Sequence, residues 1–162
     1  MRSVRRRRSG FTLTEMTVVA AILAILAGAA MPLAKIAVKR EKEIELRRSL
    51  REIRGAIDAY KKMVDEKKIE AEETEGGFPP TLDVLVKGVK LKADARGAGK
   101  SGGKIIKFLR RVPRDPMTAA GEWGLLSSQD PPDASNWGEE DVFDVYTKSR
   151  ATALDGTKYR DW

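Results

Sequence analysis

The chain has 162 residues and contains neither cysteine nor histidine. These two absences exclude a disulfide framework, a cysteine-based zinc site and a thiolate nucleophile, and they remove the commonest general base and metal ligand. The formal charge is +7, but without residues 1–10 it is only +2 (26 Lys and Arg against 24 Asp and Glu). A nearly balanced remainder argues against nucleic-acid binding.

A block of arginines, Arg2 and Arg5 to Arg8, precedes a long apolar segment, Phe11 to Ala34. As a helix these 24 residues reach about 36 Å, which is enough to cross a hydrocarbon core of about 30 Å. The arginines should stay in the cytoplasm and the rest should cross the membrane. The alternatives are a plain signal anchor and a signal peptide cut near Ala29, although the apolar run is long for the latter.

Glu15 places one carboxylate near the start of this apolar segment. A charged side chain at the centre of a membrane helix costs about 2.5–3.5 kcal/mol on insertion scales, and less near the interface. A plain anchor gives no reason for such a residue. Glu15 is therefore a functional candidate, and we expect it to have a partner.

A charged helical stretch follows, from Lys35 to about Lys68. One face carries an apolar stripe at alternating spacings of four and three: Leu46, Leu50, Ile53, Ile57, Tyr60 and Val64. The other face should be solvated and carries Arg47, Arg48, Glu52, Arg54, Lys61 and Lys62. We predict one long helix that ends in the polar run Glu70 to Glu75, before Gly76-Gly77. Gly28 and Pro32 mark a point where this helix can kink or locally melt.

The remaining residues predict short elements. These are a helix from about Thr81 to Val86, a mobile loop from Lys87 to Lys104, and strands at Trp123–Ser127 and Val142–Thr147, with Trp162 closing the core. Residues 97–101 (Gly-Ala-Gly-Lys-Ser) are no phosphate-binding loop, because Asp94 replaces the first glycine of that motif. The predicted fold is α+β: a long N-terminal helix, transmembrane in its first half and amphipathic in its second, packed on a small antiparallel sheet.

The arginines, Gly10, the run Phe11-Thr12-Leu13-Thr14-Glu15 and the hydrophobic helix together resemble the class III leader of type IV pilin-like proteins. Pro32 also falls where these proteins commonly carry a helix-interrupting proline. Three later stretches resemble the major pseudopilin of type II secretion systems, in the same order along the chain: Phe78–Leu82, Phe108–Pro116 and Asp155–Trp162. The absence of cysteine favours a pseudopilin over a pilus subunit, since many type IV pilins close their C-terminal region with a disulfide.

The resemblance implies a division into a cleaved leader (1–10), a transmembrane and filament-core helix (11–34) and a periplasmic domain (35–162). A prepilin peptidase would cut between Gly10 and Phe11 and N-methylate Phe11. Glu15 would pair with the terminal amine of a neighbouring subunit and set the register between subunits. The implied partners are further copies of the chain, an inner-membrane assembly platform, minor pseudopilins, and lipid before assembly. Neither nucleic acid nor enzymatic activity is implied.

The same family often binds calcium in its C-terminal loop, and Asp155 and Asp161 match by their position relative to Trp162. Calcium requires six to eight oxygen ligands. Two carboxylates are few, and Lys148 and Arg150 bring opposing charge. The alternative is that Asp155-Gly156 is simply a turn. Two other functions also stay open: a subunit of a type IV pilus or DNA-uptake filament, and a monomeric membrane-anchored binding domain.

Overall fold

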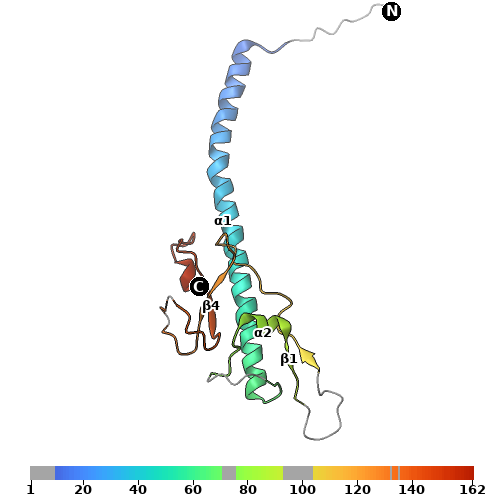
Figure 1. Ribbon diagram of the computed structural model, residues 1–162. Helices are drawn as coiled ribbons and strands as arrows, with labels where there is room; N and C mark the ends of the chain where they lie inside the picture. The colour runs from blue at the N-terminus through green and yellow to red at the C-terminus, as the bar shows by residue number, and fades with distance from the viewer. Residues whose placement is uncertain (1–9, 71–75, 93–103, 132, 135) are drawn as a thin grey trace, which may run out of the picture. The chain divides into compact units, whose positions relative to one another are not determined.

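The structure, a computed structural model, describes residues 10–70, 76–92, 104–131, 133–134 and 136–162, except for the side chains of 29–31. Residues 1–9 of the predicted leader and residues 97–101 lie outside these ranges. The elements, in chain order, are α1 (Leu13–Asp65), α2 (Leu82–Lys87), β1 (Val89–Lys90), β2 (Ile105–Ile106), β3 (Trp123–Leu126), β4 (Asp144–Thr147) and the 3₁₀ helix η1 (Tyr159–Asp161) (Figure 1). The chain divides into two compact units, Met1–Arg40 and Glu41–Trp162.

The first unit holds the N-terminal part of α1, in which Glu15 is the only charged residue before Lys35. The helix runs on through Gly28 and Pro32 without a break in its assignment. Because Pro32 has no N–H, the carbonyl of Gly28 lacks its usual donor within the helix. The melting predicted at Pro32 concerns an assembled state and stays a prediction.

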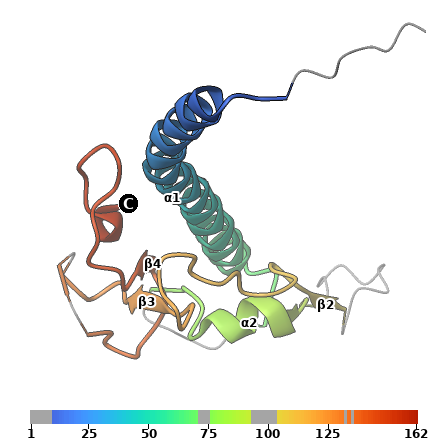
Figure 2. The same ribbon diagram turned by 90° about the horizontal axis from the view of Figure 1, so that it is seen from above.

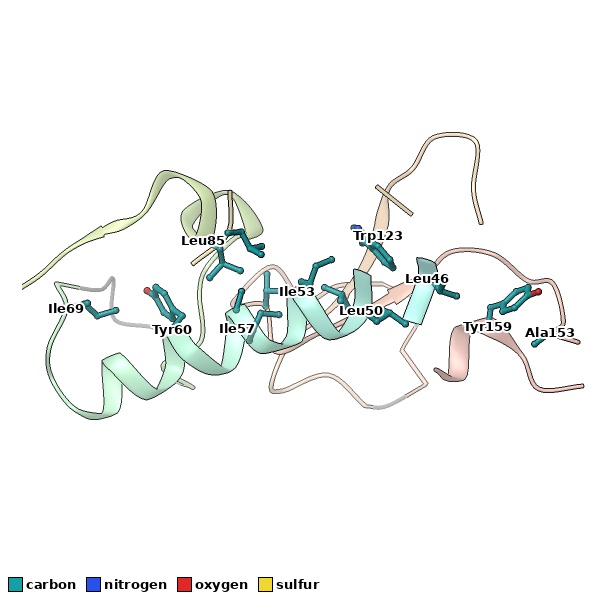
Figure 3. Packing of buried hydrophobic residues seen from close by; sticks show 14 residues of the cluster. Leu46, Leu50, Ile53, Ile57, Tyr60, Ile69, Leu85, Trp123, Ala153 and Tyr159 are labelled. Carbon is teal, nitrogen blue, oxygen red and sulfur yellow. The ribbon is translucent and has the colours of Figure 1, made fainter. Parts of the chain in front are cut away.

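The core of the second unit lies against one face of α1. The predicted stripe is confirmed, because Leu46, Leu50, Ile53, Ile57 and Tyr60 are each at most 3 % exposed. Its last residue, Val64, is partly buried against the same core. Figure 3 shows these side chains on one side of the helix, toward residues from the rest of the unit. The main partners from the remaining elements are Ile69, Leu85, Leu109, Trp123, Val142, Val145, Ala153 and Tyr159. This one-sided burial is what an amphipathic helix requires of a globular unit.

The helix ends earlier than predicted, at Asp65 rather than in the run 70–75. Lys67 adopts the left-handed conformation, with φ of 54°. Its N–H donates a hydrogen bond to the carbonyl of Val64 at 2.8 Å, and the N–H of Lys68 donates one to the carbonyl of Met63 at 3.0 Å. These two bonds form a Schellman motif, which satisfies carbonyls that a helix end leaves open. The prediction failed because a lysine here takes the place that glycine usually occupies.

The stretch from Lys87 to Lys104 is not wholly a loop, which corrects the prediction. β1 pairs antiparallel with β2, with Val89 opposite Ile106 and Lys90 opposite Ile105. An isolated bridge joins Leu91 to the buried Ile69. The middle of the predicted loop, residues 93–103, lies outside the described ranges. α2 agrees with the predicted short helix to within one residue at each end.

Strands β3 and β4 confirm the two predicted strands. They run antiparallel, with Trp123 opposite Thr147 and Leu126 opposite Asp144. A Cβ at Gly124 would overlap the ring of Tyr146 on the opposite strand, so the close pairing requires glycine there. The α+β fold with a long N-terminal helix is confirmed. Its sheet consists of two separate two-stranded pairs, which lie apart in both views (Figures 1 and 2).

Candidate functional site

The N-terminus of α1 is where the sequence placed the principal functional residues. Thr12 precedes the helix, and its hydroxyl accepts a hydrogen bond from the N–H of Glu15 at 3.2 Å. Thr12 also accepts, at its carbonyl, the first bond of the helix from Met16, at 3.1 Å. The spacing Thr-x-x-Glu is that of a capping box, which we did not use as a signal in the sequence. It shows that the helix begins two residues after Phe11.

Glu15 lies in the first turn of α1, and its side chain is exposed. A carboxylate in a first turn interacts favourably with the helix dipole, typically by about 0.3–1 kcal/mol. This local gain is smaller than the cost of placing the same carboxylate in lipid. Capping alone therefore does not account for Glu15 in a segment of this composition.

Gly10 and Phe11 precede the helix and touch little of the chain. Phe11 is 78 % exposed. No heavy atom beyond the chain neighbours of Gly10 lies within 4 Å of the position a Cβ would take there, so packing within the chain does not require glycine. The same holds for Gly28 in α1. A requirement for glycine at position 10 would come from outside the folded chain.

The large apolar side chains described between Phe11 and Val38 are about half exposed or more within the described part of the chain. Twelve large ones are at least 47 % exposed: Phe11, Leu13, Met16, Val18, Val19, Ile22, Leu23, Ile25, Leu26, Leu33, Ile36 and Val38. By length and composition α1 can cross a membrane, and none of its most apolar window is buried. Such a surface is consistent with membrane anchoring.

The predicted calcium residues are placed in different surroundings. The carboxylate of Asp155 accepts bonds from the hydroxyl and the N–H of Thr157 at 2.6 and 2.9 Å, and it faces the guanidinium of Arg47 at 3.6 Å. The hydrogen bond from the Thr157 hydroxyl is the main reason why the pKa of Asp155 lies below its ordinary value. Asp161 instead lines an open groove of about 560 Å³ beside β4.

Calcium does not fit this arrangement as the residues stand. Within the described ranges no three Asp or Glu side chains come together in a way that could hold a metal ion. Asp155 already has a cation beside it, which takes the place that a divalent ion would need. Calcium at Asp155 and Asp161 stays a prediction without geometric support.

Arg54 was assigned to the solvated face, and this assignment was wrong. Its Nε and Nη2 donate to the two carboxylate oxygens of Asp144 at 2.6 and 3.2 Å. Nη1 and Nη2 also donate to the main-chain oxygens of Trp162 and Val145, at 2.8 and 3.2 Å. The side chain is half-buried and joins α1 to β4 and to the C-terminal segment. Helical periodicity alone could not reveal this, since the partners lie about 90–108 residues away along the chain.

Two further side chains of α1 hold the C-terminal segment. The carboxylate of Glu43 accepts bonds from the N–H of Leu154 and the hydroxyl of Tyr159, both at 2.8 Å. Burial, and then this bond to Glu43, raises the pKa of Tyr159 to about 12. The guanidinium of Arg47 lies 3.8 Å from the ring centroid of Trp162, a cation–π contact. The predicted role of Trp162 as a cover for the core agrees with these contacts.

Comparison with known proteins identifies the N-terminal region. Residues 5–31 match the family described as the prokaryotic N-terminal methylation motif. The match spans Gly10, Phe11 and Glu15 and most of the apolar part of α1. Neither the curated proteins nor the solved structures gave a match. The motif is that of a type IV pilin-like prepilin leader, and it indicates a substrate of prepilin peptidase.

Proposed function

We propose that this type IV pilin-like chain is the major subunit of a pseudopilus, the periplasmic filament of a type II secretion system. In this proposal the peptidase cuts between Gly10 and Phe11 and methylates the new amine. The processed chain waits in the inner membrane with its C-terminal unit in the periplasm and then joins a helical filament. The observation that carries the proposal is the methylation motif over residues 5–31.

The apolar half of α1 supports assembly through that segment. Moving it from water into lipid or a bundle of helices removes twelve large side chains from water, at roughly 1.5–3 kcal/mol for each one fully buried. Moving it from lipid into a filament gains almost none of this again, because lipid tails are as apolar as leucine. Specific contacts must therefore direct the transfer from membrane to filament.

Glu15 supplies such a contact in our proposal. Cleavage leaves an ammonium at Phe11, two residues before the positive end of the helix dipole. A carboxylate from a neighbouring copy would neutralise this amine, and each group would offset the desolvation of the other. Removing one member of a buried pair typically costs about 3–5 kcal/mol, so register errors that separate the two groups are strongly disfavoured.

Secretion is favoured over a pilus by the resemblance of Phe78–Leu82, Phe108–Pro116 and Asp155–Trp162 to the major pseudopilin, and by the absence of cysteine. The C-terminal segment is instead held by Arg54, Glu43 and Arg47. Minor pseudopilins and the assembly platform would be further partners. A pilus or DNA-uptake filament would use the same leader chemistry, so only the apparatus served separates these functions.

The test begins with the full chain co-expressed with a prepilin peptidase, and the intact mass of the membrane-extracted product is measured. We expect loss of residues 1–10 and the gain of one methyl group. Glu15→Val should be cut and inserted but should not form filaments, whereas the control Thr14→Val should assemble. Normal filaments from Glu15→Val would refute the role of Glu15. A processed wild-type chain that stays monomeric would instead favour the membrane-anchored binding domain.

The second step separates secretion from a pilus. In cells that carry both machines, one assembly platform is removed at a time, and the polymer formed by the processed chain is measured. We expect the polymer to disappear with the type II platform only. Loss with the pilus platform alone would assign the chain to the pilus.

A further inference from the structure

The sheet β1–β2 has one packed face and one exposed face. Side chains alternate along paired strands, so Val89, Leu91 and Ile106 share one face, and these are partly buried against the core. The opposite face is exposed, and we call it the lysine face; it consists of Lys90, Lys92, Ile105 and Lys107. Ile105 is 54 % exposed, an unusual position for an isoleucine between lysines.

The cations of the lysine face have no acidic partner within the described part of the chain. Salt bridges there involve neither Lys90, Lys92 nor Lys107. The cause lies in the sequence, because residues 84–114 contain ten Lys and Arg and a single acid, Asp94. Although positive and negative charges nearly balance after residue 10, the positive charges are concentrated in residues 84–114.

The compensating acids lie together in another segment. Residues 128–147 contain six Asp and Glu and no Lys or Arg. Asp144 is paired with Arg54, Asp141 is buried under hydrogen bonds from Ser127 and Ser128, and Asp130 accepts bonds from the main chain. The remaining acids are exposed. Together with the exposed Phe143 of the same segment, we call these exposed residues the acidic face: Asp133, Glu139, Glu140 and Phe143. Asp133 and Phe143 also line the groove beside β4, whose lining includes Lys158 and Arg160.

The two faces match in composition and oppose one another in charge. Each has three like charges and one half-exposed apolar side chain, Ile105 at 54 % and Phe143 at 50 %. Within the second unit, β1–β2 and the loop between β3 and β4 lie at opposite ends in both views (Figures 1 and 2). One copy of the chain therefore cannot bring its own two faces together.

We propose that the lysine face of one copy binds the acidic face of the next copy along the filament. The contact is heterologous and does not close on itself, so it propagates in one direction, as a filament requires. This inference rests on the proposed filament function. It names the surfaces by which the C-terminal units recognise one another outside the membrane.

Such a contact is weak on its own and salt-sensitive. Ion pairs between exposed side chains contribute little individually, and they are screened over about 10 Å at 0.1 M salt. In the filament, packing of the apolar halves of α1 holds the C-terminal units close together. The two faces then have a high effective concentration, so even a weak contact between them forms. Its main effect is to orient the units and to reject wrongly charged partners.

The test uses the absence of cysteine, which makes any introduced disulfide unambiguous. Full-length Lys107→Cys and Glu140→Cys are co-expressed as two separate chains in cells that assemble the wild-type filament. We expect a mixed disulfide dimer, and no dimer from either variant alone, since the contact places position 107 beside 140. Lys62→Cys, an exposed site on neither face, should give no bond with Glu140→Cys.

Charge reversal gives an independent readout. Lys90→Glu with Lys107→Glu should reduce polymer, as should Glu139→Lys with Glu140→Lys, and combining all four changes should restore it. Processed polymers that give no 107–140 disulfide and ignore both reversals would overturn this inference and leave the proposed function intact. An uncut, monomeric chain would overturn both. Loss of binding to anionic vesicles in the lysine reversal, with polymer unchanged, would assign the lysine face to lipid instead.

Discussion

The two halves of α1 differ in what covers their apolar side chains. In the second half the stripe from Leu46 to Tyr60 is buried by the chain itself, at most 3 % exposed. In the first half the large apolar side chains that the structure describes are at least 47 % exposed. Both halves belong to one helix, so helical propensity does not separate them. The distribution of charge separates them. A stripe backed by charges indicates a partner on one side within the chain, whereas a helix that is apolar on all sides except at Glu15 indicates partners all round.

The largest expected effect tests this contrast directly. Ile53→Ala should lower the free energy of unfolding of the second unit by about 2–5 kcal/mol, because Ile53 is fully buried. Ile25→Ala in the first half should leave that free energy unchanged. The measurement is denaturant unfolding of the full chain in detergent, followed by tryptophan fluorescence, since all three tryptophans lie in the second unit. Equal losses in the two variants would contradict the contrast.

Arg54→Met tests whether a charged side chain of α1 contributes to the stability of the second unit. It removes the bonds to Asp144, Val145 and Trp162 from a half-buried position, so we expect a loss of about 1–3 kcal/mol. The matched control is Arg51→Met, because Arg51 is exposed and makes no salt bridge among the described residues. The same unfolding assay applies, and a neutral Arg54→Met would return that residue to the solvated face.

Tyr159→Phe tests how much the hydrogen bond between α1 and the C-terminal segment contributes to stability. The variant loses the bond to Glu43, for an expected cost of about 1 kcal/mol at pH 8. The pKa of Tyr159 in the folded chain is raised to about 12 from 10, so its contribution to stability is complete below pH 10 and is lost as the pH rises through 12. Unfolding at pH 8 and pH 11 should therefore show a smaller difference between the two proteins at pH 11. A difference that grows with pH would contradict the assignment.

Lys67→Gly tests the end of the helix. Glycine adopts a φ of 54° without steric cost, so we expect a gain of about 0.5–1 kcal/mol. The neighbouring exposed Lys68→Gly is the control and should give no gain, because Lys68 is not in the left-handed region. A destabilised Lys67→Gly would mean that the lysine side chain contributes more than the backbone strain costs.

The smallest effect concerns calcium. Arg47 and Thr157 already satisfy Asp155, so the melting temperature of the full chain should be the same with calcium and with chelator. A calcium-dependent rise that Asp155→Ala abolishes would restore the family-based expectation. Arg47→Met provides the complementary variant, since it removes the competing cation from Asp155.

The sequence was sufficient where a regular period or a local turn determined the structure. The stripe from Leu46 to Tyr60, the helix after Thr81 and the pair β3–β4 were predicted within a few residues. The end of α1 was missed because Lys67 carries out a role for which glycine is the usual signal. Strand β1 was missed because only two residues pair, and they stand among lysines and glycines.

The site divides in the same way. Gly10, Phe11 and Glu15 could be found because the leader is a local pattern of adjacent residues. Arg54 and Glu43 could not, since each binds partners about 90–116 residues away along the chain, and no period records such pairings. Their types, an arginine and a glutamate on a charged helix, are the same as those of their solvated neighbours.

These distant pairings also fix the order of events when the chain is made. The stripe on α1 leaves the ribosome long before Asp144, which follows Arg54 by 90 residues. At about 5–20 residues per second the cover of the stripe stays incomplete for roughly 5–20 s. During that interval an amphipathic helix next to a membrane lies on its surface. Closure of the second unit therefore comes late in synthesis, and under the proposed function the membrane that anchors the chain also covers its unfinished core.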